Sequence, residues 1–264
     1  MEFNDTSWVP LALRETVIEA LGRTLDWGRI MHGAALPFHQ FLEASGAAEV
    51  LDLCSGAGDP AAILLRELGR VGLRAPRILM TDLTPNVEAW TRLVREHPDT
   101  LDFVSSPVDA TAIPAALGAG RARVIINALH HFRPALARSV LRSACADSPG
   151  FFLVEGFERN PLRFAAFAPA GIPALLVNPV LAPRRRVAKA FLTWLTPLAF
   201  AASMWDGLVS TLRVYTEDEL REMVRGFGDG FVWTYGTWRF GVVGEAYYFF
   251  GVPRVRRASS PHAS

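Results

Sequence analysis

The sequence is poor in cysteine and carries no excess of charge of either sign. Its 264 residues include two cysteines, Cys54 and Cys145, and a formal net charge of +1. Two cysteines are too few for a disulfide scaffold and fit a reducing compartment. A nucleic-acid-binding surface normally shows a strong basic excess, so no nucleic-acid partner is expected.

Signals for export, membrane insertion and metal binding are also missing. The first residues, MEFNDTSWVP, lack a basic region followed by an apolar core, so we predict no secretory signal and a cytoplasmic protein. The uncharged run Ala190–Trp205 is too short for a comfortable transmembrane helix, so no span is expected. No metal site is predicted, because metal-ligand spacing is missing around His32, His39, His97 and His262.

Short apolar runs alternate with amphipathic segments between residues 50 and 155. The expected strands are Val50–Leu53, Arg77–Thr81, Leu101–Val104, Arg123–Asn127 and Gly150–Glu155. The expected helices between them are Pro60–Arg70, Asn86–Glu96 and Pro134–Cys145. This alternation predicts an α/β protein with a mostly parallel sheet that is covered on both faces. Ligands of such sheets bind outside the carboxyl ends of the strands.

The flanking segments predict a cap, an insertion and a closing hairpin. Residues 1–46 are expected to form a helical N-terminal cap that Pro37 breaks, and residues 161–213 an apolar insertion after the fifth strand. After a helix at Thr216–Arg225, the strands Phe231–Trp233 and Ala246–Gly251 are close enough to pair as an antiparallel hairpin. Residues 47–160 and 214–253 would then form the core, and 254–264 a frayed tail.

The most informative stretch is VLDLCSGAGDPAA, residues 50–62. Gly56 and Gly58 form a turn of small residues that leaves backbone N–H groups uncovered at a helix N-terminus, where a nucleotide-like ligand can bind. Asp59 is predicted to cap that helix, and Pro60 suits its first position. Alone, the glycines could equally make an ordinary tight turn between strand and helix.

Polar side chains follow each of the first four strands. Asp52 ends the first strand, Asp82 the second and Asn127 the fourth, and Asp109 follows the third. The predicted architecture points all four toward one crevice. A carboxylate after the second strand can accept hydrogen bonds from both hydroxyls of a ribose, and an acid after the third can accept one from an adenine amino group.

With these residues the chain resembles the class I S-adenosylmethionine-dependent methyltransferases. The family's acid and glycine-rich turn match Asp52, Gly56 and Gly58, although its usual first glycine is Cys54 here. The resemblance covers roughly residues 45–160 and, more weakly, 214–252. It implies a Rossmann-like, seven-stranded sheet whose last strand is antiparallel, with S-adenosylmethionine as cofactor and S-adenosylhomocysteine as product.

The resemblance also assigns cofactor contacts. It makes Asp82 the ribose-binding acid and Asp109 the adenine-binding acid. The neighbours that it adds to the cofactor site are Leu83, Ala110 and Asn127. A nicotinamide-dependent dehydrogenase stays open as an alternative, because Gly56–Ala61 also fits the dinucleotide fingerprint G-x-G-x-x-A.

A histidine pair follows the fourth strand, beside the expected methyl group. His130 suits a general base because histidine titrates near neutral pH, and Glu155, at the end of the fifth strand, could orient its ring. Some natural-product sugar O-methyltransferases carry such a pair and carboxylate, so the resemblance makes His130 the base. The alternative is that His130 and His131 have a structural role only and begin the next helix.

The apolar insertion allows three interpretations. With the N-terminal cap it could form a lid over an apolar acceptor, it could be a buried helical hairpin, or residues 184–205 could contact a membrane surface. We therefore predict a methyltransferase that acts on a small apolar or aromatic metabolite of natural-product type, with O-methylation favoured over C-methylation. A membrane-surface or lipid-binding module is a second alternative, and the sequence does not indicate an oligomeric state.

Overall fold

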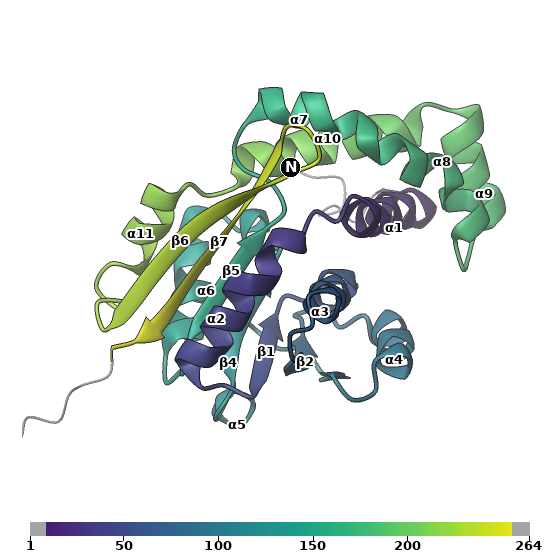
Figure 1. The fold of residues 1–264 in the computed structure, drawn as a ribbon. Coiled ribbons are helices and arrows are strands. Elements are labelled where there is room, and N and C mark those ends of the chain that lie inside the picture. The colour runs from purple at the N-terminus through teal and green to yellow at the C-terminus, as the bar shows by residue number, and fades with distance from the viewer. Residues whose placement is uncertain (1–8, 255–264) are drawn as a thin grey trace, which may run out of the picture.

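A seven-stranded sheet forms the centre of the computed structural model, which describes residues 9–254 (Figure 1). The strands lie in the order β3-β2-β1-β4-β5-β7-β6. Their bounds are β1 Glu49–Leu53, β2 Arg77–Thr81, β3 Leu101–Phe103, β4 Ala122–Ile126, β5 Phe151–Glu155, β6 Phe231–Phe240 and β7 Gly244–Pro253.

The first five strands pair in parallel, whereas β7 is antiparallel to both β5 and β6. The order of the strands reverses between β1 and β4, and ligands of doubly wound sheets bind at such a switch point. An all-parallel dinucleotide-binding sheet would lack the antiparallel β7–β6 pair. The expected mostly parallel, seven-stranded sheet with an antiparallel last strand is confirmed.

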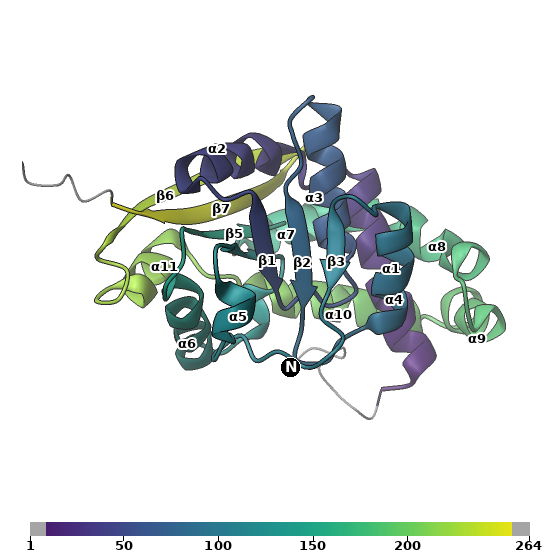
Figure 2. The same cartoon turned by 90° about the horizontal axis from the view of Figure 1, so that it is seen from below.

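Helices cover both faces of the sheet. The helices of the cap and core are α1 Leu11–Trp27, α2 Ala35–Ser45, α3 Asp59–Arg70, α4 Val87–Glu96, α5 Ala115–Gly118, α6 Pro134–Cys145 and α11 Glu217–Val224. Figure 2 shows α2 and α3 on one face of the sheet and α6 and α11 on the other. Each face has its own buried apolar cluster, centred on Phe38, Phe41 and Phe152 on the α2 side and on Leu141, Phe151 and Phe249 on the α6 side.

Two local expectations are wrong. Pro37 does not break a helix but lies in the first turn of α2, where its missing N–H has no intrahelical partner to lose. The closing hairpin is much longer than expected, because β6 continues through Gly236 to Phe240. Gly236 is needed there, since a Cβ would lie 2.3 Å from the Tyr248 hydroxyl on the paired strand. The short helix α5 was not expected either.

The apolar insertion folds into helices over the carboxyl ends of the parallel strands. They are α7 Pro161–Phe167, α8 Ile172–Leu181, α9 Arg186–Ala190, the π-helical turn Phe191–Leu195 and α10 Leu198–Arg213. α8 and α10 pack against α1, and α10 contacts the 3-10 turn Leu129–His131 that follows β4. The partition of the chain into cap, core and lid stays a prediction, and residues 255–264 of the expected tail lie outside the described residues.

One helix of the insertion is long and apolar enough to cross a membrane. It runs through α7 and α8, Pro161–Leu181, with a mean hydropathy of 1.7 and only 22% of its window buried. Arg186–Leu195 and Leu198–Arg213 pass the same test only as a pair, and they are bent by 83°. The expectation of no span considered Ala190–Trp205 alone. Because Pro161–Leu181 qualifies by length and composition only, that expectation stays a prediction.

Candidate functional site

The glycine turn after β1 has the conformation that its sequence predicts. Cys54, Gly56 and Gly58 all have positive φ, at 64°, 54° and 85°. A Cβ at Gly58 would lie 2.7 Å from Leu93 Cδ1, so the close approach of α4 requires glycine. A Cβ at Gly56 would meet nothing within 4 Å, so this side of the turn is open. The turn can therefore admit a ligand against the backbone at Gly56.

Hydrogen bonds from residues that the sequence did not indicate stabilise the glycine turn. The Trp90 indole Nε1 donates a 3.0 Å hydrogen bond to the Gly56 carbonyl. Ser55 Oγ accepts from the Thr81 N–H at 3.1 Å, and Thr81 Oγ1 donates to the Asp52 carbonyl at 2.8 Å. These bonds connect the end of β1 to the end of β2. The positions of Trp90 and Thr81 in the sequence do not predict these contacts.

Asp59 does not cap α3 as expected. Gly58 is the N-cap residue without a side-chain cap bond, and Asp59 lies inside the first turn. A Cβ at Gly22 of α1 would lie 3.5 Å from the Asp59 carboxyl carbon. Burial raises the pKa of Asp59, and the nearby Arg92 and Arg66 oppose the rise. Helix α1 therefore lies directly over the N-terminus of α3, next to the glycine turn.

Asp52 is a buried carboxylate that lacks a partner for one oxygen. Its Oδ1 is buried without a hydrogen bond among the described residues. Burial raises the pKa of Asp52 to about 7, with a hydrogen bond from Ser55 opposing the rise and the charge of Asp82 adding to it. A buried carboxylate with an unpaired oxygen is costly unless a cation or donor completes it. This residue is therefore suited to a positively charged group of a ligand.

Asp82 follows β2 and is fixed by two backbone donors. Its Oδ2 accepts from the Gly56 N–H at 2.9 Å and its Oδ1 from the Thr84 N–H at 2.8 Å. Each carboxylate oxygen has a second lone pair, so both can still accept from a ligand. The adjacent Leu83 is exposed, which leaves an apolar side chain next to this carboxylate.

Asp109 and Ala110 follow β3. Asp109 Oδ1 accepts from both the backbone N–H and the hydroxyl of Thr111, at 2.8 and 2.7 Å. These bonds hold the pKa of Asp109 below its ordinary value. Ala110 is buried in the cluster on the α6 side of the sheet. Asp109 is thus an exposed, ionised acceptor on a turn whose position is fixed by packing.

The charges of all three aspartates act on Cys54. Burial raises the pKa of the Cys54 thiol, and the carboxylates of Asp82, Asp52 and Asp109 raise it further, in that order. Such an effect requires all three charges to lie near one sulfur atom. The structure therefore brings together the acids that the sequence places after three different strands.

Asn127 joins the ends of β4 and β5. It has a positive φ of 55°. Its N–H donates to the Val154 carbonyl at 2.7 Å, and its Oδ1 accepts from the Gly156 N–H at 3.0 Å. A Cβ at Gly156 would also lie 3.3 Å from Leu25 Cδ2 of the N-terminal cap. Its amide oxygen thus has a structural task, and its contact with a cofactor stays a prediction.

His130 and Glu155 form a buried pair across the ends of β4 and β5. The Nδ1 of His130 lies 2.7 Å from Glu155 Oε2, and the His130 backbone N–H donates to Oε1 at 3.2 Å. An ionised carboxylate only accepts, so Nδ1 carries the proton and Nε2 keeps a lone pair. The structure therefore brings together the histidine and the carboxylate that the sequence paired, and their roles as base and orienting group stay predictions.

The surroundings of this pair include Phe157 and Tyr247, which the sequence did not single out. The ring of Phe157 lies 5.3 Å from that of His130, centroid to centroid, and His131 lies at 4.3 Å on the same measure. Tyr247 of β7 is in register with Glu155, and burial together with the Glu155 charge raises its pKa well above the usual value. The long-range pairing of β7 with β5 is what brings Tyr247 there.

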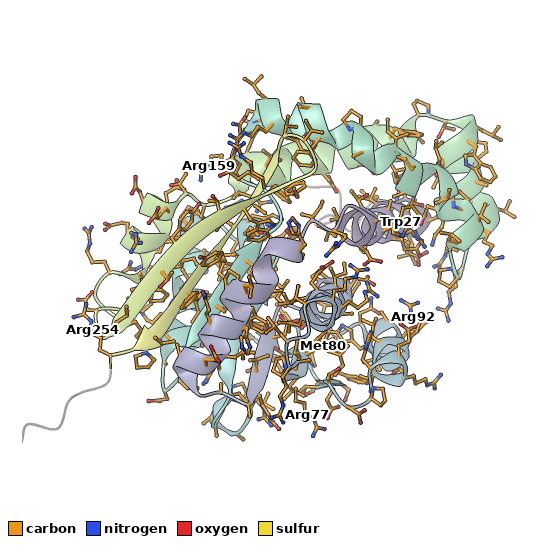
Figure 3. The ribbon with its side chains drawn as sticks, viewed as in Figure 1. Trp27, Arg77, Met80, Arg92, Arg159 and Arg254 are labelled. Atoms are coloured by element: carbon orange, nitrogen blue, oxygen red, sulfur yellow. The ribbon has the colours of Figure 1, made fainter. Side chains whose placement is uncertain are left out.

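Two cavities among residues 9–254 lie away from these groups. One, of 410 Å³, lies between α11 and the start of β6 near Arg254, and the other, of 130 Å³, near Arg77 at the amino ends of β1 to β4. Figure 3 labels both arginines, Arg254 at the lower left and Arg77 at the bottom of the molecule. In the described part of the chain, no three His, Cys, Asp or Glu side chains group to hold a metal ion.

No protein-family model and no curated protein matches the sequence. Among solved structures it is similar to an O-methyltransferase family protein from Burkholderia thailandensis, with 16% identity, a TM-score of 0.44 and 86% of this chain against 58% of that one. It is also similar to human N-acetylserotonin methyltransferase, with 14% identity and a TM-score of 0.47, and the match covers 90% of this chain and 55% of that one. A third similar structure is the methyltransferase domain of bacterial CtHen1, with 12% identity and a TM-score of 0.49, and the match covers 86% of this chain and 99% of that one.

The chain thus spans little more than half the length of the first two of these structures. Its own strand order and antiparallel β7 give the described residues the fold of the class I S-adenosylmethionine-dependent methyltransferases, as the sequence resemblance implied. The activity has to be argued from the site residues themselves.

Proposed function

We propose that this protein is an S-adenosylmethionine-dependent methyltransferase that acts on a hydroxyl of a small molecule. The observation that carries the proposal is the gathering of Asp52, Asp82 and Asp109 around one glycine turn, with the His130–Glu155 pair at the neighbouring strand ends. A dehydrogenase remains the weaker candidate, because the antiparallel end of the sheet departs from the dinucleotide-binding topology.

The residues present fit this cofactor group by group. The unpaired oxygen of buried Asp52 suits the ammonium of the methionine portion, and the exposed lone pairs of Asp82 suit the two ribose hydroxyls. Asp109, Ala110 and Leu83 would bind and cover the adenine. The open side of Gly56 and the backbone at Cys54, Gly58 and Asn127 would line the rest of the site.

The cofactor supplies an electrophilic methyl group when it is bound. The task of the protein is then to align the acceptor, exclude water and remove the hydroxyl proton. His130 Nε2 is the group that takes this proton, because Nδ1 is committed to Glu155. Glu155 in turn holds the ring in one tautomer and stabilises its protonated form, in the manner of a base and its orienting partner.

The acceptor proposed here is an apolar or aromatic metabolite of natural-product type. The cap helix α1 and the apolar helices of the insertion lie over the crevice, where Leu25 and Ile30 approach Gly156. A carbon acceptor is the second choice, because the buried Glu155 could also stabilise positive charge on a carbon.

A transfer assay tests the proposal. Purified protein is incubated with S-adenosylmethionine that is labelled on its methyl group and with a panel of phenols, aromatic carboxylic acids and hydroxylated polyketides. The proposal predicts label in an O-methylated product and S-adenosylhomocysteine in equal amount, with the rate of formation of both lowered by about two to four orders of magnitude in His130→Ala. Reduction of a panel carbonyl by NADH, without methyl transfer, would support the dehydrogenase instead.

A further inference from the structure

Helix α9 and the π-helical turn that follows it present an inverted surface. Val187, Phe191 and Leu195 recur at every fourth position, and their exposed fractions are 85%, 54% and 76%. Lys189 and Thr193, on the opposite side of the same segment, are 0% and 3% exposed. Helices at the surface of a protein in water show the reverse pattern, with apolar residues inside and charged residues outside.

The buried charge is held by the N-terminal cap. Lys189 Nζ lies 2.7 Å from Glu19 Oε1 and 3.2 Å from Glu15 Oε2, both on α1. Pairing is what makes burial of an ammonium tolerable. The network therefore fixes which side of α9 faces the protein, and the apolar stripe is left facing outward.

Helix α8, which contacts α9, also exposes apolar side chains. We call the apolar outer face the six exposed side chains Val180, Leu181, Val187, Phe191, Trp194 and Leu195. The Trp194 indole Nε1 donates a 2.9 Å hydrogen bond to the Leu176 carbonyl, which links the turn to α8. Both helices lie at the outer end of the molecule in Figures 1 and 2. Exposed apolar patches of this kind mark an interaction site.

Basic residues border this face. Arg184, Arg185 and Arg186 connect α8 to α9, and all three are exposed. Arg184 pairs with Glu88 at 2.6 Å, and Arg185 pairs with Glu15. Exposed ion pairs contribute little, so these arginines can exchange partners at small cost. An apolar face with tryptophan and a basic border matches the chemistry of an anionic membrane surface.

We propose that the apolar outer face docks this protein on the surface of a bilayer that contains anionic lipids. Helices α8 and α9 lie in the plane of the membrane and do not cross it. The reason is that α8 packs along α1, which carries the charged residues Glu15, Glu19 and Arg23. A helix with these partners could not enter the hydrocarbon core without burying their charges. This proposal does not depend on the proposed enzymatic reaction.

Vesicle flotation with variants tests the proposal. The full chain is mixed with vesicles of phosphatidylcholine alone or with added phosphatidylglycerol. The double variant Val187→Glu/Leu195→Glu changes only exposed side chains, so it should fold. Val232→Glu is the matched control, because Val232 is 51% exposed and belongs to β6, which lies away from α9 in Figure 1. Circular dichroism and S-adenosylhomocysteine binding check that each variant is intact.

The proposal predicts that the wild type and Val232→Glu float with the anionic vesicles. The double variant should partition at least ~10-fold less, because two apolar side chains no longer enter the interface. Arg184→Gln/Arg186→Gln should lose about tenfold on anionic vesicles and little on neutral ones. The proposal is overturned if the wild type stays at the bottom of the gradient without the anionic vesicles, or if the double variant floats equally well.

A second copy of the chain is the competing occupant. Sedimentation velocity without lipid separates the two: a wild-type dimer that Val187→Glu/Leu195→Glu converts to a monomer would assign the face to self-association and overturn membrane docking. A monomer for both proteins, with flotation of the wild type only, supports it. Loss of cofactor binding in every preparation would count against the proposed enzyme and leave the flotation result standing.

Discussion

The Nδ1 of His130 lies 2.7 Å from Oε2 of Glu155, and both side chains are buried where β4 and β5 end. This contact joins residues that are 25 positions apart and sets the tautomer of the histidine. Because Nδ1 faces Glu155, Nε2 of His130 is the candidate proton acceptor.

His130→Ala should lower kcat by about two to four orders of magnitude, as expected for loss of a general base. The dissociation constant of S-adenosylhomocysteine should stay within about twofold, because the aspartates are untouched. Steady-state kinetics and calorimetry measure the two quantities. His32→Ala, which changes an exposed histidine, is the control. Full turnover by His130→Ala would leave this histidine with a structural role only.

Glu155→Gln should give a smaller loss than His130→Ala, because an amide oxygen can still accept from Nδ1 but cannot balance the charge of a protonated ring. Steady-state kinetics on the two variants and the wild type measures both losses. Normal kcat in Glu155→Gln would show that Glu155 does not act on the base.

Asp82→Ala should weaken the binding of S-adenosylhomocysteine by about 1–3 kcal/mol, because charge-assisted hydrogen bonds to the ribose are lost. Asp102→Asn is the matched control, since Asp102 also belongs to the sheet but pairs with Arg77 at its surface. Calorimetry on both variants measures the difference. Equal affinity in Asp82→Ala and the wild type would remove the ribose assignment.

The buried Asp52 predicts a pH dependence of cofactor binding. Its pKa is about 7 in the folded protein without ligand, so it is mostly protonated below that pH. Pairing with an ammonium requires the ionised form, and S-adenosylhomocysteine affinity should therefore rise from pH 5.5 to 7.5 with release of a proton on binding. Calorimetry in buffers of different ionisation enthalpy measures that proton. In Asp52→Asn the affinity should be lower and its pH dependence should disappear.

The same carboxyl predicts a pH dependence of stability. A folded-state pKa of about 7 lies above the ordinary value for an aspartate, so the folded protein holds this proton more tightly and loses stability as pH rises toward and through 7. Relative to Asp52→Asn, the wild type should lose on the order of 2–3 kcal/mol of unfolding free energy between pH 5 and pH 8. Urea unfolding of both proteins at the two pH values provides the test.

The two glycines of the turn should respond differently to alanine. Gly58→Ala should destabilise the fold by about 2–4 kcal/mol, because its φ is positive and its Cβ would lie 2.7 Å from Leu93 Cδ1. Gly56→Ala should cost only about 1 kcal/mol of stability, since its Cβ meets nothing, but it should weaken cofactor binding. Thermal unfolding and calorimetry distinguish the two, and similar effects of both substitutions would contradict the open side at Gly56.

Much of the fold could be predicted because its signals are local. The alternation of apolar runs and helices located β1 to β5, and the short connection located the closing hairpin. The length of β6 could not be predicted, because it depends on the fit of Gly236 against Tyr248 of β7. The burial of Lys189 was equally hidden, since the acids that pair with it lie 170 residues away or more.

The site was predictable to a similar extent. Acids after strands and a glycine turn are visible in the sequence, and the parallel sheet brings them together. The cap on α3 was predicted wrongly, because α1 covers Asp59 and leaves Gly58 as the N-cap residue. The groups that hold the turn, Trp90 and Thr81, depend on contacts between elements and carry no signal of their own.

The most direct test of the proposed cofactor site is calorimetry of the purified protein with S-adenosylhomocysteine and, in parallel, with NAD. We expect one S-adenosylhomocysteine bound per chain, an affinity lowered by both Asp52→Asn and Asp82→Ala, and no heat with NAD. No binding of S-adenosylhomocysteine, or tight binding of NAD that these two substitutions abolish, would contradict it.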